Sequence, residues 1–197
     1  MARKIAVAAV AALLVTVFVG VSCACVGKSL VIGSVNTPYS STVAEMLGIL
    51  ITERTGTTVV VKYFSDYRSL VEAAKKGEAD IVVDYTGRCY VDVLGKSAEM
   101  DAAKVFSTVK DVYQREMNLV WLEPFGFSDA GVVKNAPAVA APIVRKDTLT
   151  KFPALPRVIN KLAGRIDNAA MARLASESAG GKTKKVTRKF LKDNKLI

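Results

Sequence analysis

Short apolar runs alternate along the chain with segments in which apolar residues recur every three or four positions. Residues 29–35 (SLVIGSV), 57–64 (TTVVVKYF) and 79–85 (ADIVVDY) are rich in apolar and β-branched residues, and each predicts a strand. Residues 42–56 and 66–77 have apolar positions at helical spacing and each ends at a glycine, which predicts a helix. This β-α-β-α-β order predicts an α/β fold with a mainly parallel sheet flanked by helices.

The later segments extend the sheet and then become helical. Residues 101–117 predict a long helix, and residues 119–125 (LVWLEPF) and 140–146 (AAPIVRK) predict two more strands. Trp121 lies between apolar neighbours in the first of these strands, and we expect it in the core. The rest of the chain predicts C-terminal helices separated by glycines, and no internal repeat is present.

Capping residues indicate where several helices begin. Thr42 and Glu45 have the spacing of a capping box, which places the start of the first helix near residue 42. Asp66 and Asp167 each precede an apolar pattern of helical period, so we expect both to cap helices.

The N-terminal 25 residues have the pattern of a secretory signal. Arg3 and Lys4 precede 17 uncharged residues, and small residues follow. A run of this length is also at the lower limit for a membrane-spanning helix, so an uncleaved anchor is the alternative. We divide the chain into a signal at 1–25 and a mature domain at 26–197. The mature domain is expected in the periplasm or at the outer face of the cytoplasmic membrane.

Two cysteines stand at the end of this signal. Val21-Ser22-Cys23 resembles a loose bacterial lipobox, with Gly20 where leucine is usual, and this likeness implies lipidation of Cys23. The alternative is an ordinary cleavage site, with Cys25 and Cys89 free or paired together. We expect Cys89 to act as a small buried hydrophobic residue.

The composition excludes several classes of chemistry. The chain has no histidine and no CxxC pair, so it lacks imidazole ligands for a metal and a histidine general base. It also has no nucleophile elbow and no phosphate loop. We therefore predict a protein that is not an enzyme and that uses no metal or cofactor.

The net charge of +10 is concentrated at the C-terminus. Residues 182–195 contain one acid, Asp193, and seven basic residues: Lys182, Lys184, Lys185, Arg188, Lys189, Lys192 and Lys195. This tail has two interpretations: a solvated helix face, or a helix lying near anionic lipid. Export and the single aromatic residue, Phe190, argue against nucleic acid as a partner.

Two loops carry polar and aromatic side chains directly after predicted strands. Residues 36–41 (NTPYSS) follow the first strand and residues 85–87 (YTG) follow the third. Ligands of open α/β sheets bind beyond the carboxyl ends of the strands, so these loops are candidates for a ligand edge. Turn chemistry alone is the alternative explanation of their composition.

Several segments resemble the substrate-binding proteins of bacterial ABC importers for glycine betaine, choline and related osmoprotectants. The segments that carry the likeness, in the order of the family, are IGSVNTPYSSTVAEML, KKGEADIVVDYTGR, WLEPFGFSDA, APIVRKDTLTKFPALPRVINKLAGRIDNAAMARL and VTRKFLKDNKLI. The resemblance implies a type II periplasmic-binding fold, in which two lobes close over a cationic solute. It also implies an ABC transporter permease as the partner.

The resemblance assigns roles to both candidate loops. A quaternary ammonium has no hydrogen-bond donor, so aromatic faces and diffuse negative charge recognise it. The family's tyrosine for this purpose falls on Tyr85, and Asp84 stands where the family usually has glutamate. The implied ligand-binding residues are Asn36, Thr37, Tyr39, Asp84, Tyr85, Thr86 and Gly87.

Each of these roles has a structural alternative. Tyr85 can instead pack under the following helix, and Asp84 can pair with Arg88, four residues on. Asn36 and Thr37 can instead cap the helix that follows them.

The chain departs from the family after Phe125. Only 14 residues, Gly126 to Val139, separate this segment from the return strand, whereas a separate domain needs roughly 50 residues. We therefore expect one lobe and half a ligand cleft. Such a chain rebuilds the cleft as a homodimer, binds solute weakly, serves as a surface-anchored interaction or adaptor domain that no longer binds solute, or is a degraded remnant.

Overall fold

The computed structural model describes residues 29–197, and its centre is a single five-stranded sheet. The strands are β1 (Leu30–Val35), β2 (Val59–Phe64), β3 (Ile81–Tyr85), β4 (Leu119–Trp121) and β5 (Ala140–Arg145). Their spatial order is β2-β1-β3-β5-β4. β1 pairs in parallel with β2 and β3, whereas β5 is antiparallel to both β3 and β4. The α/β prediction is confirmed, and the sheet is mixed because one strand runs against the other four.

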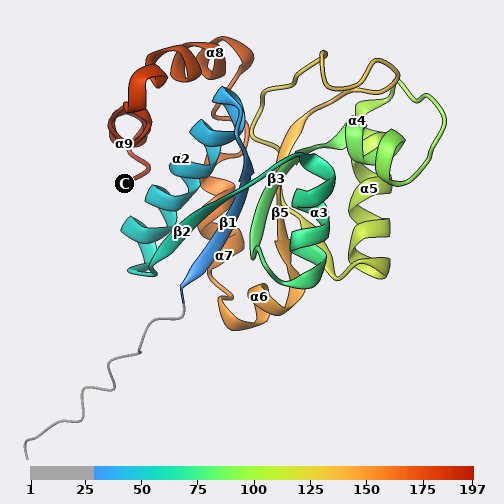
Figure 1. Cartoon of the computed structure of the whole chain (residues 1–197), viewed down its shortest axis with the longest axis horizontal. Coiled ribbons are helices and arrows are strands. Elements are labelled where there is room, and N and C mark those ends of the chain that lie inside the picture. Colours follow the sequence, from blue (N-terminus) through green and yellow to red (C-terminus); the bar gives the residue numbers. More distant parts are fainter. Residues whose placement is uncertain (1–28) are drawn as a thin grey trace, which may run out of the picture.

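Helices cover both faces of the sheet (Figure 1). α2, α7, α8 and α9 contribute to one hydrophobic core, and α3 and α5 contribute to the other. The helical elements are α2 (Pro38–Thr55), α3 (Tyr67–Lys76), α4 (Thr86–Arg88), the π-helix η1 (Cys89–Val93), α5 (Ala102–Glu116), α6 (Lys146–Lys151), α7 (Leu155–Ile159), the 3-10 turn η2 (Asn160–Leu162), α8 (Asn168–Glu177), the 3-10 turn η3 (Ala179–Gly181) and α9 (Thr183–Asp193).

The helix caps test the predicted boundaries. Asp66 caps α3 by accepting a hydrogen bond from the Ser69 amide at 2.7 Å, and Asp167 caps α8 in the same way. The predicted start of the first helix at Thr42 is wrong, because Thr37 is the N-cap and α2 begins at Pro38. Proline suits this first helical position, since its missing N–H is not needed there.

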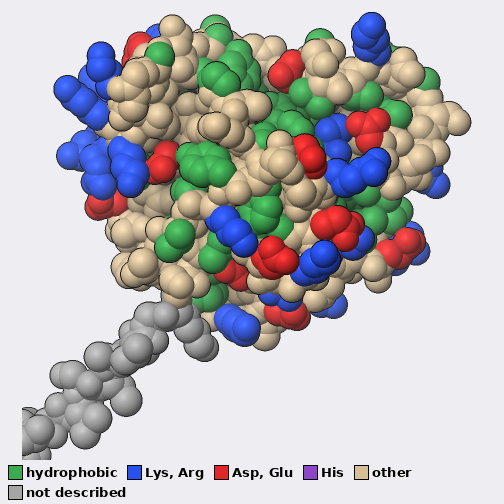
Figure 2. All heavy atoms as spheres, in the orientation of Figure 1, with side chains coloured by type: hydrophobic (Ala, Val, Ile, Leu, Met, Phe, Trp, Pro, Cys, Tyr) green, Lys and Arg blue, Asp and Glu red, His purple; other side chains and the backbone are tan. Residues whose placement is uncertain are grey.

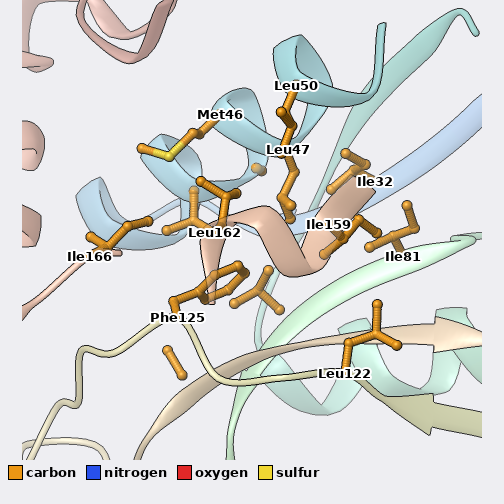
Figure 3. Close-up of a cluster of buried hydrophobic side chains, with 14 of the residues drawn as sticks. Ile32, Met46, Leu47, Leu50, Ile81, Leu122, Phe125, Ile159, Leu162 and Ile166 are labelled. Carbon is orange, nitrogen blue, oxygen red and sulfur yellow. The ribbon is translucent and has the colours of Figure 1, made fainter. Parts of the chain in front are cut away.

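The larger core lies between α2 and the sheet. Figure 3 shows Met46, Leu47 and Leu50 of α2 in the same cluster of buried side chains as Ile159. Each of these residues is no more than 1% exposed. Burial of one such side chain contributes about 1.5–3 kcal/mol, so this contact surface accounts for much of the attachment of α2.

The second core contains two residues whose burial was expected. Trp121 is 1% exposed, with its ring edge-to-face against Tyr113 at a centroid distance of 5.6 Å. Cys89 is a free cysteine that is fully buried. Burial raises the pKa of its thiol, so the group stays neutral.

Basic side chains gather at one side of the molecule, over α9 (Figure 2). α9 buries Thr187 and Leu191, while its lysines and Arg188 are exposed. Arg188 pairs with Glu53 of α2, and Lys189 pairs with Asp193. Within residues 29–197, no helix combines the length and the apolar character needed to cross a membrane. The predicted signal and Cys23 lie outside the described residues.

Candidate functional site

The two candidate loops lie at the same edge of the sheet. β1 and β3 are parallel neighbours, so Asn36 follows one strand and Thr86 follows the other at their common carboxyl edge (Figure 1). The Thr37 hydroxyl accepts a hydrogen bond from the Ser40 amide at 3.3 Å. Asn36 and Thr37 nevertheless remain exposed. The loop therefore caps α2 and still faces solvent at this edge.

A row of aromatic rings connects these loops. Tyr67 at the start of α3 packs edge-to-face on Tyr85, with ring centroids 6.0 Å apart. Tyr85 packs in the same way on Phe127 at 6.4 Å, and Phe127 on Tyr39 at 6.2 Å. Phe125 stacks on the back of Phe127 at 6.0 Å. Edge-to-face pairs are favourable for aromatic rings, so the row is a rigid platform.

Solvent reaches the ends of this row but not its middle. Tyr85 is 4% exposed and Phe127 is 1% exposed, whereas Tyr39 and Tyr67 are only partly buried. Tyr85 thus packs inside the lobe, with its ring against Tyr67 and Phe127. The rings that a solute can reach are those of Tyr39 and Tyr67.

Burial also determines the charge state of the platform. It raises the pKa of the Tyr85 phenol, and the neighbouring Tyr67 adds to this effect. Burial likewise raises the pKa of Tyr67, and the negative charge of Asp84 raises it further. Both phenols are therefore neutral across the physiological range, and their ring faces keep the negative potential that attracts cations.

Asp84 is paired within the lobe. Its carboxylate is fully buried and accepts hydrogen bonds from the Arg88 guanidinium, one of them from Nε at 2.7 Å. Burial by itself lowers the pKa of Arg88, but the hydrogen bonds and charge of Asp84 outweigh it and raise the pKa. The guanidinium also lies over the Tyr67 ring, 5.2 Å from its centroid. The charge of Asp84 is therefore already balanced, and the pair fixes the end of β3 beneath the aromatic row.

Thr86 and Gly87 hold the segment 126–139 over this edge. The Thr86 hydroxyl donates to the Pro137 carbonyl at 2.9 Å and accepts from the Val139 amide at 3.1 Å. The Thr86 amide donates to the Val139 carbonyl at 2.9 Å. Thr86 is 1% exposed, so its contacts are with the protein itself. The short segment that joins the two halves of the chain thus folds back onto the β3–α4 junction.

Two residues of the platform were not among the sequence predictions. Tyr67 follows the Asp66 cap at the carboxyl end of β2, and Phe127 belongs to the segment after β4. The positional rule that selected the loops after β1 and β3 applies equally to the loop after β2, so it could have found Tyr67. Phe127 reaches the row by a long-range fold of segment 126–139, for which the sequence has no local signal.

The described part of the chain contains no cluster of three or more His, Cys, Asp or Glu side chains that could hold a metal. The site consists of neutral tyrosines, an internally balanced ion pair and a hydroxyl-bearing loop. Such a surface can bind a small solute, and it offers no nucleophile or general base for covalent chemistry.

Comparison with known proteins decides the family. The family model for the substrate-binding domain of ABC-type glycine betaine transport systems matches residues 28–133, which is more than half of the chain. The chain belongs to this family. It is therefore a solute-binding transport component and not an enzyme, as the sequence predicted.

Several solved structures have the same fold. A glycine betaine/carnitine/choline ABC transporter protein aligns with a TM-score of 0.77 and 16% identity, over 86% of this chain and 99% of that chain. YehZ from Escherichia coli, without ligand, aligns with a TM-score of 0.74 and 13% identity, over 87% of this chain and 100% of that chain. Lactococcal OpuAC, closed over glycine betaine, aligns with a TM-score of 0.52 and 11% identity, over 85% of this chain and 96% of that chain. The type II periplasmic-binding fold is confirmed, here as one lobe.

Proposed function

We propose that this family member binds a quaternary ammonium osmoprotectant, such as glycine betaine or choline, for an ABC importer. The observation that carries the proposal is the aromatic row at the ligand edge of the sheet, with Tyr39 and Tyr67 at its open ends. A cation without hydrogen-bond donors gains most of its recognition energy from such ring faces. Asn36 and Thr37, exposed beside the row, offer an amide and a hydroxyl to a solute carboxylate.

The other predicted site residues have supporting roles in this proposal. Tyr85 is the buried centre of the row, and Asp84 with Arg88 fixes its position. Thr86 and Gly87 hold the covering segment rather than the solute. The position of Arg88 supports Tyr67 as a cation-binding residue, because the Arg88 guanidinium lies 5.2 Å from the centroid of the Tyr67 ring. One face of this tyrosine thus accepts an internal cation in the manner proposed for the solute.

A single lobe limits the affinity. One cation–π contact contributes roughly 0.5–2 kcal/mol, whereas a millimolar dissociation constant requires about 4 kcal/mol. Two such contacts reach about 4 kcal/mol only at their upper limit, so the open half-site binds solute at best in the millimolar range. Tighter binding requires a second surface that excludes water, and a second copy of the chain facing the first would supply it.

Isothermal titration with glycine betaine and choline tests the proposal. Tyr39→Leu and Tyr67→Leu are each expected to weaken binding by roughly 2- to 30-fold, because each variant loses one cation–π contact. Tyr63→Leu is the matched control, since Tyr63 is a 49% exposed tyrosine of β2 outside the row. The proposal fails if neither solute binds at millimolar concentration, or if the control loses as much affinity as the site variants.

Sedimentation velocity with and without solute distinguishes the assemblies. A shift from monomer to dimer on adding glycine betaine supports a cleft rebuilt from two chains. A monomer that binds weakly supports the open half-site. A chain that binds no solute in either state supports the adaptor role, in which the lobe serves only as an interaction domain.

We propose that the protein acts at the outer face of the cytoplasmic membrane, with an export signal within its first 25 residues and Cys23 as the lipidated residue. Mass spectrometry of the mature N-terminus tests this proposal, because an unmodified Cys23 in the mature protein rejects lipidation. Sedimentation of an unlipidated form with anionic vesicles tests the basic surface of α9. Binding that is lost at high salt supports membrane contact, since the attraction of basic residues to anionic lipid is screened.

A further inference from the structure

A hollow lies beside the proposed site, between the start of α2 and the junction of α8 with α9. It has a volume of about 320 Å³. α2 contributes its first turns, and the C-terminal helices close the opposite side (Figure 1). Nine residues line it, and the six polar ones are Asn36, Thr37, Ser41, Thr42, Ser178 and Thr183.

Two buried hydroxyls of this hollow have no partner among the described residues. Thr42 is 1% exposed and Ser178 is 8% exposed, and neither side-chain oxygen has a hydrogen-bond partner within residues 29–197. A buried hydroxyl without a partner is costly, so each such group needs a physical explanation, and a bound molecule that supplies the missing hydrogen bond is one. These two come from different helices and line the same space.

The remaining lining residues define the chemistry of a ligand. Six of the nine carry an amide or a hydroxyl, and the other three are Pro38, Ala175 and Ala179. Among the described residues that line the hollow, none is charged, so an ion would have no counter-charge there. Hydroxyl groups both donate and accept, and hydroxyl groups of a ligand match them in both respects. The proline and alanine carbons can contact the C–H surface of the same ligand.

We propose that this hollow binds a small neutral polyhydroxylated solute, with Thr42 and Ser178 as its buried hydrogen-bond partners. The site is separate from the aromatic row, because Tyr39, Tyr67 and Tyr85 do not line it. The hollow shares Asn36 and Thr37 with the quaternary ammonium proposal, but Thr42 and Ser178, on which the present proposal rests, have no part in that one. Failure of one proposal therefore leaves the other intact.

The test is an amide-shift NMR titration of the full chain with glycerol and with myo-inositol as neutral probes. Acetate and tetramethylammonium are the charged comparisons. Saturable shifts at Thr42, Ser178 and Thr183 with a neutral probe, and none with the charged probes, are expected. The proposal is overturned if both neutral probes leave these amides unshifted, or if acetate saturates the hollow at lower concentration than they do.

Variants assign the contacts within the hollow. Thr42→Val and Ser178→Ala are each expected to weaken binding of the neutral probe about 2- to 10-fold, the effect of one lost hydrogen bond. Thr42→Ser keeps the hydroxyl and is expected to bind as the parent does, which separates the contact from any folding defect. Ala179→Leu, at an exposed position, is expected to fill the hollow and abolish the shifts. Unchanged affinity in both hydroxyl variants contradicts the proposal.

Tyr39→Leu distinguishes the two sites. This variant is expected to lose affinity for glycine betaine and to keep its affinity for the neutral probe. Equal loss for both solutes would mean that one site serves both, and the separate hollow would be rejected.

Discussion

Gly87 packs against the carbonyl oxygen of Pro137 with no space for a side chain. A Cβ atom on Gly87 would lie 2.8 Å from this oxygen and 2.9 Å from both the Ala136 oxygen and Val133 Cγ1. The Thr86 hydroxyl, one residue earlier, donates to the same Pro137 carbonyl. The β3–α4 junction and segment 126–139 are therefore one packed unit, and the cover over the aromatic row depends on this glycine.

Gly87→Ala is expected to destabilise the protein by about 1–3 kcal/mol, because the added methyl group forces backbone atoms apart. Urea denaturation measures the change. Gly48→Ala, within α2, is the matched control, since the nearest neighbour of its added Cβ would be Val59 Cγ1 of β2 at 3.6 Å, which is an ordinary contact distance. This control is expected to stabilise the helix by about 0.5–1 kcal/mol. Equal stability of the two variants would contradict the packing of segment 126–139.

Asp84→Asn is expected to cost about 3–5 kcal/mol, because it leaves the Arg88 guanidinium buried without its partner. Asp111→Asn removes the carboxylate of an exposed pair with Arg115 at the same i,i+4 spacing, and it should cost less than about 1 kcal/mol. Chemical denaturation of both variants gives the comparison. A similar small cost at both positions would show that the Asp84–Arg88 pair is hydrated rather than enclosed.

Sequence and structure agree best where a feature depends on near neighbours. The caps at Asp66 and Asp167 form hydrogen bonds three residues along the chain, and their composition signals them directly. The antiparallel direction of β5 depends on how the irregular segment 122–139 returns to the sheet, which no local periodicity records. The same long-range return brings Phe127 between Tyr39 and Tyr85.

At the ligand edge, the positions of residues could be predicted from the sequence, but their burial could not, for a similar reason. Tyr85 and Asp84 were placed correctly at the end of β3, but their burial depends on segment 126–139 and on Arg88. A sequence pattern identifies the strand end and its side chains. It does not show which neighbouring segment covers them.

Tyr85→Phe is expected to make the protein more resistant to alkali. Burial raises the pKa of the Tyr85 phenol in the folded state, so the neutral form favours folding below the unfolded pKa of about 10. This contribution is lost as the pH rises above that value, because the unfolded chain then releases a proton that the folded chain keeps. The urea midpoint should therefore fall less between pH 8 and pH 11 in the variant than in the parent.

Tyr63→Phe is the control for this pH effect, since it removes a phenol that is 49% exposed. It should show the same loss of stability between pH 8 and pH 11 as the parent. Absorbance of tyrosinate should appear for Tyr85 only together with unfolding. Ionisation of Tyr85 in the folded protein at pH 11 would contradict its burial.

Cys89 is expected to resist alkylation in the folded protein. Its side chain is fully buried and burial raises the pKa of its thiol, so the reactive thiolate is suppressed and the reagent has no access. Reaction with iodoacetamide at pH 8 should therefore require opening of the core, and peptide mass spectrometry can follow residue 89 alone. The reaction should be fast in 8 M urea and should accelerate in Gly87→Ala, because that variant loosens the neighbouring junction. A native rate equal to that in urea would place Cys89 at the surface.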